Sequence, residues 1–294
     1  MEKSSMTAVQ IKGSSKMFKR KFNALLRKFV RYQFIKIDEF SDLQLYEDNK
    51  ICHENKYLNI GAGNFYHPFW TNLDFDTSHY SQKNHRGKFP KYFIEHDLNS
   101  LTSLPVGSET VDVIYISHVC EHLPNGTVQF LFSECNRVLK EDGVFRITGP
   151  DIDLICDAYL TNDRHFFEVG YGESSKQHSL EQLFLDQIVS SKSKVRRATE
   201  FIHDDILKQM FVEFSREEAF DKLIAFADKE TYSENPHFHM NWFNQKKMKQ
   251  FLLRAGFKTV YPSGYMQSKC AILRNSVLFD LKRPQWSMYV EAKK

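Results

Sequence analysis

The stretch that decides the fold is Tyr57-Leu58-Asn59-Ile60-Gly61-Ala62-Gly63-Asn64. Its apolar first half predicts a short buried strand, and two glycines come soon after. Because glycine has no Cβ, the backbone can turn sharply there and approach a ligand closely. A dinucleotide fingerprint would need a third glycine or alanine where Tyr66 stands, and no Gly-Lys-Ser/Thr of a P-loop follows. The stretch therefore predicts a ligand-binding turn that does not hold a pyrophosphate.

The chain on both sides of this turn has the pattern of an α/β sheet. Short apolar runs predict strands near residues 56–60, 71–75, 92–96, 111–117 and 144–148. Between the last two, an apolar stripe at helical spacing begins at Val128 and stops before Gly143. A strand, a helix and a strand in this order predict parallel pairing. A further helix over 248–255 precedes strands expected near 257–261 and 277–281.

Acidic residues stand at the ends of the second and third predicted strands. Asp74 follows the second strand, where a carboxylate can accept hydrogen bonds from both hydroxyls of a ribose. Asp97 follows the third strand and could accept from an adenine amino group. Either acid alone is more often a turn or helix cap. Together with the glycine turn, they predict a site for a nucleoside at the carboxyl edge of the sheet.

Candidate catalytic residues follow the fourth and fifth strands at the same edge. His118 and His122 flank Glu121, and Asp151 comes after the fifth strand. The alternatives are that His122 caps the next helix, that Glu121 is an ordinary helix-start acid, and that Asp151 is a turn carboxylate. A histidine near its ordinary pKa is the usual base for a hydroxyl proton.

A second pair of histidines precedes the helix at 248–255. His237 and His239 share one side if that segment is extended, and such a pair could face substrate, act as a base or bind metal. Two histidines without a nearby carboxylate or cysteine are only half of a metal site. We therefore expect His239 among the catalytic candidates and no metal.

Composition limits the possible classes of protein. The chain has 294 residues, 41% of them hydrophobic, and a formal charge of +3, which argues against a general nucleic-acid binder. Five separated cysteines without a CxxC pair argue against structural zinc and disulfides, so a cytoplasmic protein is expected. From Lys12 to Lys36 the pattern is that of a basic amphipathic helix. Docking on the domain is favoured for this helix, and peripheral contact with the inner membrane face is the alternative.

Several segments together resemble the class I S-adenosylmethionine-dependent methyltransferases. The matching stretches are LNIGAGN, NLDFD, HDL, LPVGSETVDVI, SHVCEHL and NRVLKEDGV, within residues 57–150, and a weaker likeness covers 241–283. The resemblance implies a Rossmann-like α/β fold: a seven-stranded, mostly parallel sheet with an antiparallel last strand and helices on both faces. A short segment after the glycines and Asn59 in place of the family's frequent acid resemble a bacterial branch associated with surface polysaccharide synthesis.

The resemblance also implies roles for residues of the turn and the strand ends. It places Gly61 and Gly63 under the methionine part of S-adenosylmethionine, Asp74 at the ribose, and Asp97 with Leu98 at the adenine. Further expected cofactor contacts are Asn59, Ala62 and Ser117.

The chain divides into four parts by pattern. Residues 1–55 hold the N-terminal helix and a connector, 56–150 the cofactor-binding half, 151–235 a helical insertion expected to cover the substrate, and 236–294 the completion of the sheet.

These features predict a methyltransferase that acts on an oxygen of a sugar, glycan or other small polar acceptor. Methyl transfer is an in-line displacement, so the protein must align the acceptor and exclude water. The expected catalytic residues are His118, His122, His239 and Asp151. An NPPY-like tetrad is absent after Ser117, which argues against amino-directed nucleic-acid methylation. The alternative is a catalytically inactive scaffold that binds a partner or a membrane surface.

Overall fold

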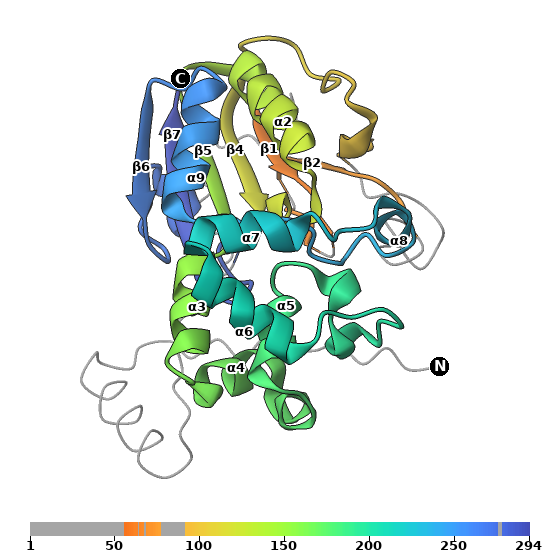
Figure 1. Cartoon of the computed structure of the whole chain (residues 1–294). Coiled ribbons are helices and arrows are strands. Elements are labelled where there is room, and N and C mark those ends of the chain that lie inside the picture. Colours follow the sequence, from red (N-terminus) through yellow and green to blue (C-terminus); the bar gives the residue numbers. More distant parts are fainter. Residues whose placement is uncertain (1–55, 64, 68, 78–91, 276–277) are drawn as a thin grey trace, which may run out of the picture. The chain divides into compact units, whose positions relative to one another are not determined.

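Seven strands form one sheet in the computed structural model, which describes residues 56–63, 65–67, 69–77, 92–275 and 278–294. Their order across the sheet is β3-β2-β1-β4-β5-β7-β6 (Figure 1). β7 is antiparallel to both of its neighbours, and the other neighbouring pairs are parallel. The strands are β1 (Tyr57–Ile60), β2 (Thr71–Asp74), β3 (Phe93–Glu95), β4 (Val111–Ser117), β5 (Leu139–Pro150), β6 (Thr259–Ser263) and β7 (Ser287–Lys293). The predicted seven-stranded, mostly parallel sheet with an antiparallel last strand is confirmed.

One face of the sheet is covered by two helices, α2 (Asn125–Val138) and α9 (Gln245–Arg254) (Figure 1). Leu58 and Ile60 of β1 point toward them and are fully buried, together with Phe145 of β5. Apolar runs of this kind are typical of parallel strands that are covered on both faces. The apolar stripes that predicted α2 and α9 are the sides of these helices that meet the sheet.

The other face of the sheet is packed differently from our prediction of helices on both faces. Alternation along the strands turns Tyr57 and Tyr115 to this side, where they pack with Trp70 and Phe279. Within the described residues, loops and the short 3₁₀ helix η8 (Ala271–Arg274) cover this face. The segment between Gly63 and β2 is too short for a helix with two connections, and none of its described residues is helical.

The strand predicted near residues 277–281 was wrong. Described residues 278–281 form a turn, in which Asp280 has a left-handed φ of +60°. Phe279 made this segment look like a strand, but its ring is buried under the sheet as part of a loop. The last strand is β7, whose buried Glu291 interrupts the apolar pattern that would have predicted it.

A buried ion cluster joins this loop to the sheet. Arg146 of β5 donates to Asp280 Oδ2 (2.5 Å) and to Glu291 Oε1 of β7 (2.8 Å), and all three side chains are fully buried. Arg146 also donates to Ser263 Oγ at the end of β6. Removal of one partner from such a cluster leaves an uncompensated buried charge. The cluster therefore fixes the loop at Asp280 and the two antiparallel pairings of β7.

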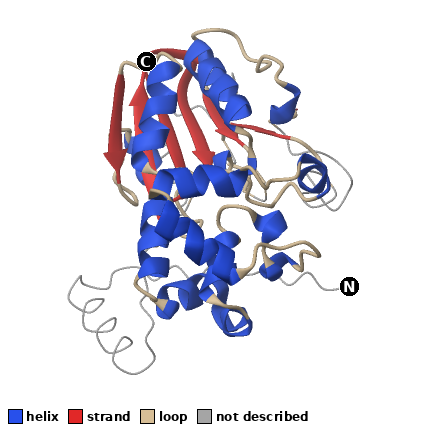
Figure 2. Cartoon of the chain, in the orientation of Figure 1, coloured by secondary structure: helices blue, strands red, loops and turns tan. Residues whose placement is uncertain are grey.

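The segment 151–235, which follows β5, is helical and contains no strand (Figure 2). Figure 1 shows it at the end of the sheet toward which the parallel strands point. It has a core of its own, centred on Phe184 and Ile188, to which Trp242 and Trp286 from the last part of the chain contribute. Its α-helices are α3 (Ile152–Leu160), α4 (Arg164–Tyr171), α5 (Leu180–Leu185), α6 (Asp204–Glu213), α7 (Arg216–Ile224) and α8 (Lys229–Glu234). Among the described residues, the 3₁₀ helices before η8 are η3 (Leu98–Ser100), η4 (Cys120–His122), η5 (Gly172–Gln177), η6 (Ser190–Lys192) and η7 (Lys194–Arg196).

Two expectations concern the membrane. The basic helix predicted in residues 1–55, with its docking or membrane contact, lies outside the described residues. Among the helices that the structure describes, none combines the length and the apolar character that a bilayer span requires.

Candidate active site

The turn after β1 has the backbone conformation that its glycines predict. Gly61 and Gly63 have φ angles of +67° and +55°, which other residues adopt only at a cost. A Cβ added to Gly61 would lie 2.3 Å from Val119 Cγ2, whereas one added to Gly63 would meet nothing within 4 Å. Gly61 thus touches the segment that follows β4, and the turn lies beside the end of that strand.

Asp74 closes the turn onto the second strand. The Gly63 amide donates to Asp74 Oδ2 (2.5 Å), and the Phe75 amide donates to Oδ1 (2.7 Å). Burial raises the pKa of Asp74, while these two amide hydrogen bonds lower it. A carboxylate oxygen can accept more than one hydrogen bond, so Asp74 keeps acceptor capacity for the hydroxyls of a ribose.

Asn59 lies behind the turn rather than at its surface. Its side chain is 2% exposed and donates to the Phe65 carbonyl (3.0 Å) and to Asn72 Oδ1 (2.9 Å). Both amide hydrogens are therefore used within the protein. Asn59, which stands where the family that the sequence resembles often has an acid, thus connects the turn to β2 and holds it in position.

The other predicted cofactor residues lie at the same edge of the sheet. Asp97 follows β3 and caps η3, because its Oδ1 accepts from the Asn99 amide (2.9 Å). Leu98 packs against the apolar core, Ser117 is the half-buried last residue of β4, and Ala62 is buried in the turn. The carboxyl ends of β1 to β4 thus bring the predicted residues to one edge.

His118 is held by the protein on both sides of its ring. It has a φ of +55°, and 5% of the residue is exposed. Its Nδ1 lies 3.1 Å from Glu121 Oε1, and its Nε2 lies 3.0 Å from the Lys282 carbonyl and 2.8 Å from Ser287 Oγ. Both ring nitrogens of His118 therefore have polar neighbours within the chain, and one of these is the carboxylate of Glu121.

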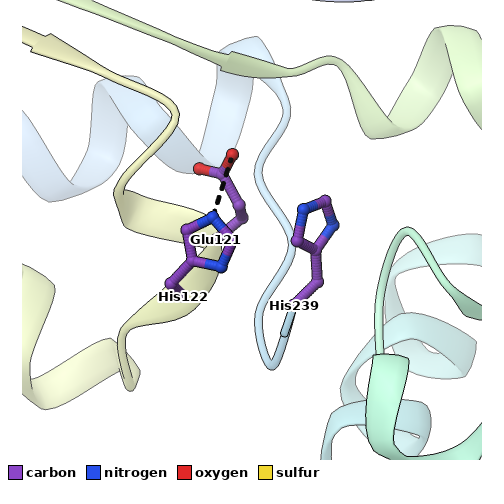
Figure 3. Close-up of side chains that lie close together, drawn as sticks. All are labelled: Glu121, His122 and His239. Atoms are coloured by element: carbon purple, nitrogen blue, oxygen red, sulfur yellow. Dashed lines mark ion pairs between the residues drawn. The ribbon is translucent and has the colours of Figure 1, made fainter. Parts of the chain in front are cut away.

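Glu121 and His122 meet His239 in a compact cluster (Figure 3). Each of the three offers one ligand atom, and these atoms lie within 4.8 Å of one another. His122 Nε2 is 3.8 Å from Glu121 Oε1, and the two imidazole rings have centroids 4.9 Å apart. The Met240 amide donates to the Glu121 carbonyl (2.9 Å), which holds the segment of His239 against η4.

The three side chains of this cluster have shifted pKa values. Burial alone would raise the pKa of Glu121, but the neighbouring histidines bring it below its usual range. Burial lowers the pKa of His122 to about 3 and that of His239 to about 4, although Glu121 acts in the opposite direction on both. At neutral pH the cluster therefore contains one carboxylate and two neutral imidazoles.

A cavity of about 10 Å³, roughly the space of one water molecule, adjoins Glu121. Its polar lining includes Thr148, Gln187 and Asn241. Glu121 Oε1, Glu121 Oε2 and Thr148 Oγ1 are buried without a hydrogen-bond partner of regular geometry among the described residues. This edge of the sheet therefore carries polar atoms with unused bonding capacity.

Part of the chain matches a known protein family. Residues 58–147, from β1 to the middle of β5, match the family model described as Methyltransferase domain. The chain contains a methyltransferase domain. Its methyl donor is S-adenosylmethionine.

Solved structures similar to the chain include several methyltransferases. An S-adenosylmethionine-dependent methyltransferase from Archaeoglobus fulgidus is 15% identical, with 94% of each chain covered and a TM-score of 0.38. One from Mesorhizobium loti is 12% identical, with 82% of this chain and 91% of that chain covered and a TM-score of 0.39. A possible histamine N-methyltransferase from Thermotoga maritima is 12% identical, with 95% and 98% covered and a TM-score of 0.37. A search of curated proteins gave no match.

The structure also shows the local contacts of the catalytic candidate Asp151 and of His237, the expected neighbour of His239. Asp151 is the N-cap of α3, because its side chain accepts from the amides of Asp153 and Leu154. His237 does not share a side with His239, because the Phe238 amide donates to the Asn235 carbonyl and makes a turn where we expected extended chain.

Glu121 is the member of the cluster that the sequence analysis did not include among its candidate site residues. We treated it as an ordinary helix-start acid beside two histidines, but the structure buries it between His118 and His122. Its position directly before His122 was visible in the sequence. The second histidine of the cluster, His239, comes from a distant part of the chain.

Proposed function

We propose that the methyltransferase domain methylates a hydroxyl oxygen of a small polar acceptor, and that sugars and glycans are the acceptor class. The observation that carries this proposal is the cluster of Glu121, His122 and His239 beside the cofactor turn. Val119, which touches Gly61 of that turn, is two residues before Glu121. A donor held by this turn would therefore lie near the polar cluster.

The residues of the turn fit S-adenosylmethionine. A Cβ at Gly61 would clash with Val119, so the bare backbone there lets the turn lie against the end of β4, whereas a Cβ at Gly63 would meet nothing within 4 Å and that side of the turn is open to a ligand. Gly61 and Gly63 would hold the methionine part, Asp74 the ribose, and Asp97 with Leu98 the adenine. When bound, S-adenosylmethionine supplies an electrophilic methyl group.

The cluster can hold the acceptor and receive its proton. Each imidazole uses Nδ1 toward a backbone carbonyl, His122 toward Phe238 and His239 toward Gln187, at 3.0 Å in both cases. The lone pair of each neutral ring is then on Nε2, where it can accept a hydroxyl proton. The neighbouring carboxylate of Glu121 stabilises the imidazolium that forms.

We also propose that the helical segment 151–235 covers the acceptor. Its Gln187 lines the cavity beside Glu121 and accepts the hydrogen bond of His239, so this segment already forms part of the wall of the site. Exclusion of water strengthens the electrostatic interactions within such a site. The assignment to surface polysaccharide synthesis rests on the resemblance of the asparagine-containing turn.

Turnover with a panel of acceptors tests the proposal. The panel contains nucleotide sugars, free sugars and short glycans, with matched amino sugars as the nitrogen-bearing control. Calorimetry first establishes the affinity for S-adenosylmethionine. We expect a methyl ether, identified by NMR of the product. Methylation of nitrogen alone, or no hydroxyl turnover by a protein that binds the donor, would overturn O-methylation.

A further inference from the structure

We propose that Glu121, His122 and His239 bind one divalent transition-metal ion. The set of two imidazoles and one carboxylate is a ligand set that Zn²⁺ and related ions take in catalytic sites. The sequence predicted no metal, because His237 and His239 lacked a carboxylate partner. The structure replaces that pair by His122 and His239 and adds the missing carboxylate of Glu121.

The spacing of the three ligand atoms suits one ion. Bonds of about 2.0–2.2 Å from a metal to nitrogen and oxygen place tetrahedral ligand atoms about 3.4 Å apart. His122 Nε2 and Glu121 Oε1 are already 3.8 Å apart, and the three atoms lie within 4.8 Å of one another. Small rotations of the side chains would therefore bring them into coordination distance.

Both histidines make a hydrogen bond through the second ring nitrogen, as metal-binding histidines commonly do. A metal-binding imidazole commonly donates its other N–H to a carbonyl or carboxylate, which fixes its tautomer and its direction. His122 Nδ1 has the Phe238 carbonyl at 3.0 Å, and His239 Nδ1 has the Gln187 carbonyl at the same distance. Both Nε2 atoms are thus left with a lone pair.

The charge of Glu121 is the second, independent observation. The residue is 3% exposed, and neither carboxylate oxygen has a hydrogen bond of regular geometry among the described residues. Within that part of the chain, its neighbours at ion-pair distance are the histidines His118 and His122. Lys282 acts on it only from farther away. Apart from these two histidine rings, at 3.1 Å and 3.8 Å, the buried carboxylate has no ion-pair neighbour among the described residues, and a bound cation would supply a compensating positive charge.

Three protein ligands leave at least one position of the ion open. A hydroxyl that coordinates there becomes more acidic, and its proton can leave to solvent water. This consequence rests on the proposed O-methylation. With the ion bound, the two Nε2 lone pairs would coordinate it and would no longer accept the proton of the acceptor hydroxyl. The binding of the ion itself stands on the geometry and does not depend on the acceptor.

Metal titration of the full chain tests the site. After treatment with a chelator, the protein is titrated with Zn²⁺ and Co²⁺ by calorimetry, and bound metal is counted by mass spectrometry. We expect one ion per chain and visible absorption bands of four- or five-coordinate Co²⁺. The variants Glu121→Gln, His122→Gln and His239→Gln should weaken binding by 10-fold or more. His165→Gln is the matched control, because the side chain of His165 is 85% exposed.

Two results would overturn the proposal. One is an unmodified protein that binds neither ion more tightly than millimolar concentrations. The other is an affinity in His239→Gln equal to that of the unmodified protein or of the His165→Gln control. Circular dichroism and S-adenosylmethionine affinity are measured for every variant, so that a misfolded variant is recognised and replaced by His239→Asn. Donor binding without metal binding would reject the metal site alone, whereas loss of both would implicate the fold.

Discussion

Substitution of Gly61 by alanine should destabilise the protein more than the same change at Gly63. Both glycines have left-handed φ angles, so each substitution carries a backbone cost of about 1–2 kcal/mol. At Gly61 alone, the new methyl group would lie 2.3 Å from Val119 Cγ2. Forcing an extra carbon into a packed position costs a further ~1–3 kcal/mol. We therefore expect a loss of about 1–2 kcal/mol for Gly63→Ala and of about 2–5 kcal/mol for Gly61→Ala.

Urea unfolding of the two variants gives these free energies, and a double-mutant cycle with Val119→Ala isolates the contact. If the methyl group introduced by Gly61→Ala clashes with Val119, the loss of unfolding free energy should fall toward that of Gly63→Ala when residue 119 is alanine. The same variants are titrated with S-adenosylmethionine, for which Gly61→Ala should bind at least 10-fold more weakly. Equal stability of the two single variants, or a cycle without coupling between positions 61 and 119, would refute the close approach of the turn to the end of β4.

Three further predictions follow from the site and the core. Asp74→Asn should weaken S-adenosylmethionine binding by about 10-fold or more in calorimetry, because an amide accepts fewer hydrogen bonds than a carboxylate; unchanged affinity would contradict its role at the ribose. The folded pKa values of His122 and His239, about 3 and about 4, lie below the ordinary 6.5, so the unfolded chain binds protons first as the pH falls. The free energy of unfolding should therefore be greatest above pH 6.5 and decrease toward pH 4, and His239→Gln should make this decrease with falling pH smaller. An unchanged decrease in His239→Gln would argue against a buried neutral ring. Arg146→Met should destabilise the protein by about 3–5 kcal/mol in urea unfolding, because it leaves two buried carboxylates uncompensated; a loss below about 1 kcal/mol would show that water reaches them.

Much of the sheet could be predicted because its cause is local. Strands β1 to β4 are short runs with defined ends, β5 contains the apolar run predicted at residues 144–148, and α2 and α9 have an apolar stripe at helical spacing. The strand expected near 277–281 failed for the opposite reason. Phe279 is buried by contacts to residues far away in the chain, and the real strand β7 contains a buried Glu291 whose partner, Arg146, is on another strand. Apolar content alone could not distinguish these two segments.

The residues proposed to bind the cofactor were easier to predict from the sequence than those proposed to bind the acceptor. Carboxyl ends of neighbouring parallel strands meet at one edge, so Asp74 and Asp97 could be placed there from strand order alone. The contacts of His118 with Lys282 and Ser287 could not be predicted, because these residues come from the other end of the chain. The capping role of Asp151 was an alternative in the sequence and became visible in its contacts with the first turn of α3.

The sequence by itself determined the glycine turn, the positions of the first five strands along the chain and the acids that follow the second and third of them. These features depend on glycine's freedom at positive φ, on the burial of apolar runs and on the polarity of strand ends, which act over a few residues. Only the tertiary structure decided that His239 joins Glu121 and His122 and that the turn at Gly61 touches Val119. Such contacts depend on how β4, the helical segment and the last part of the chain pack together, and no short stretch of sequence contains that information.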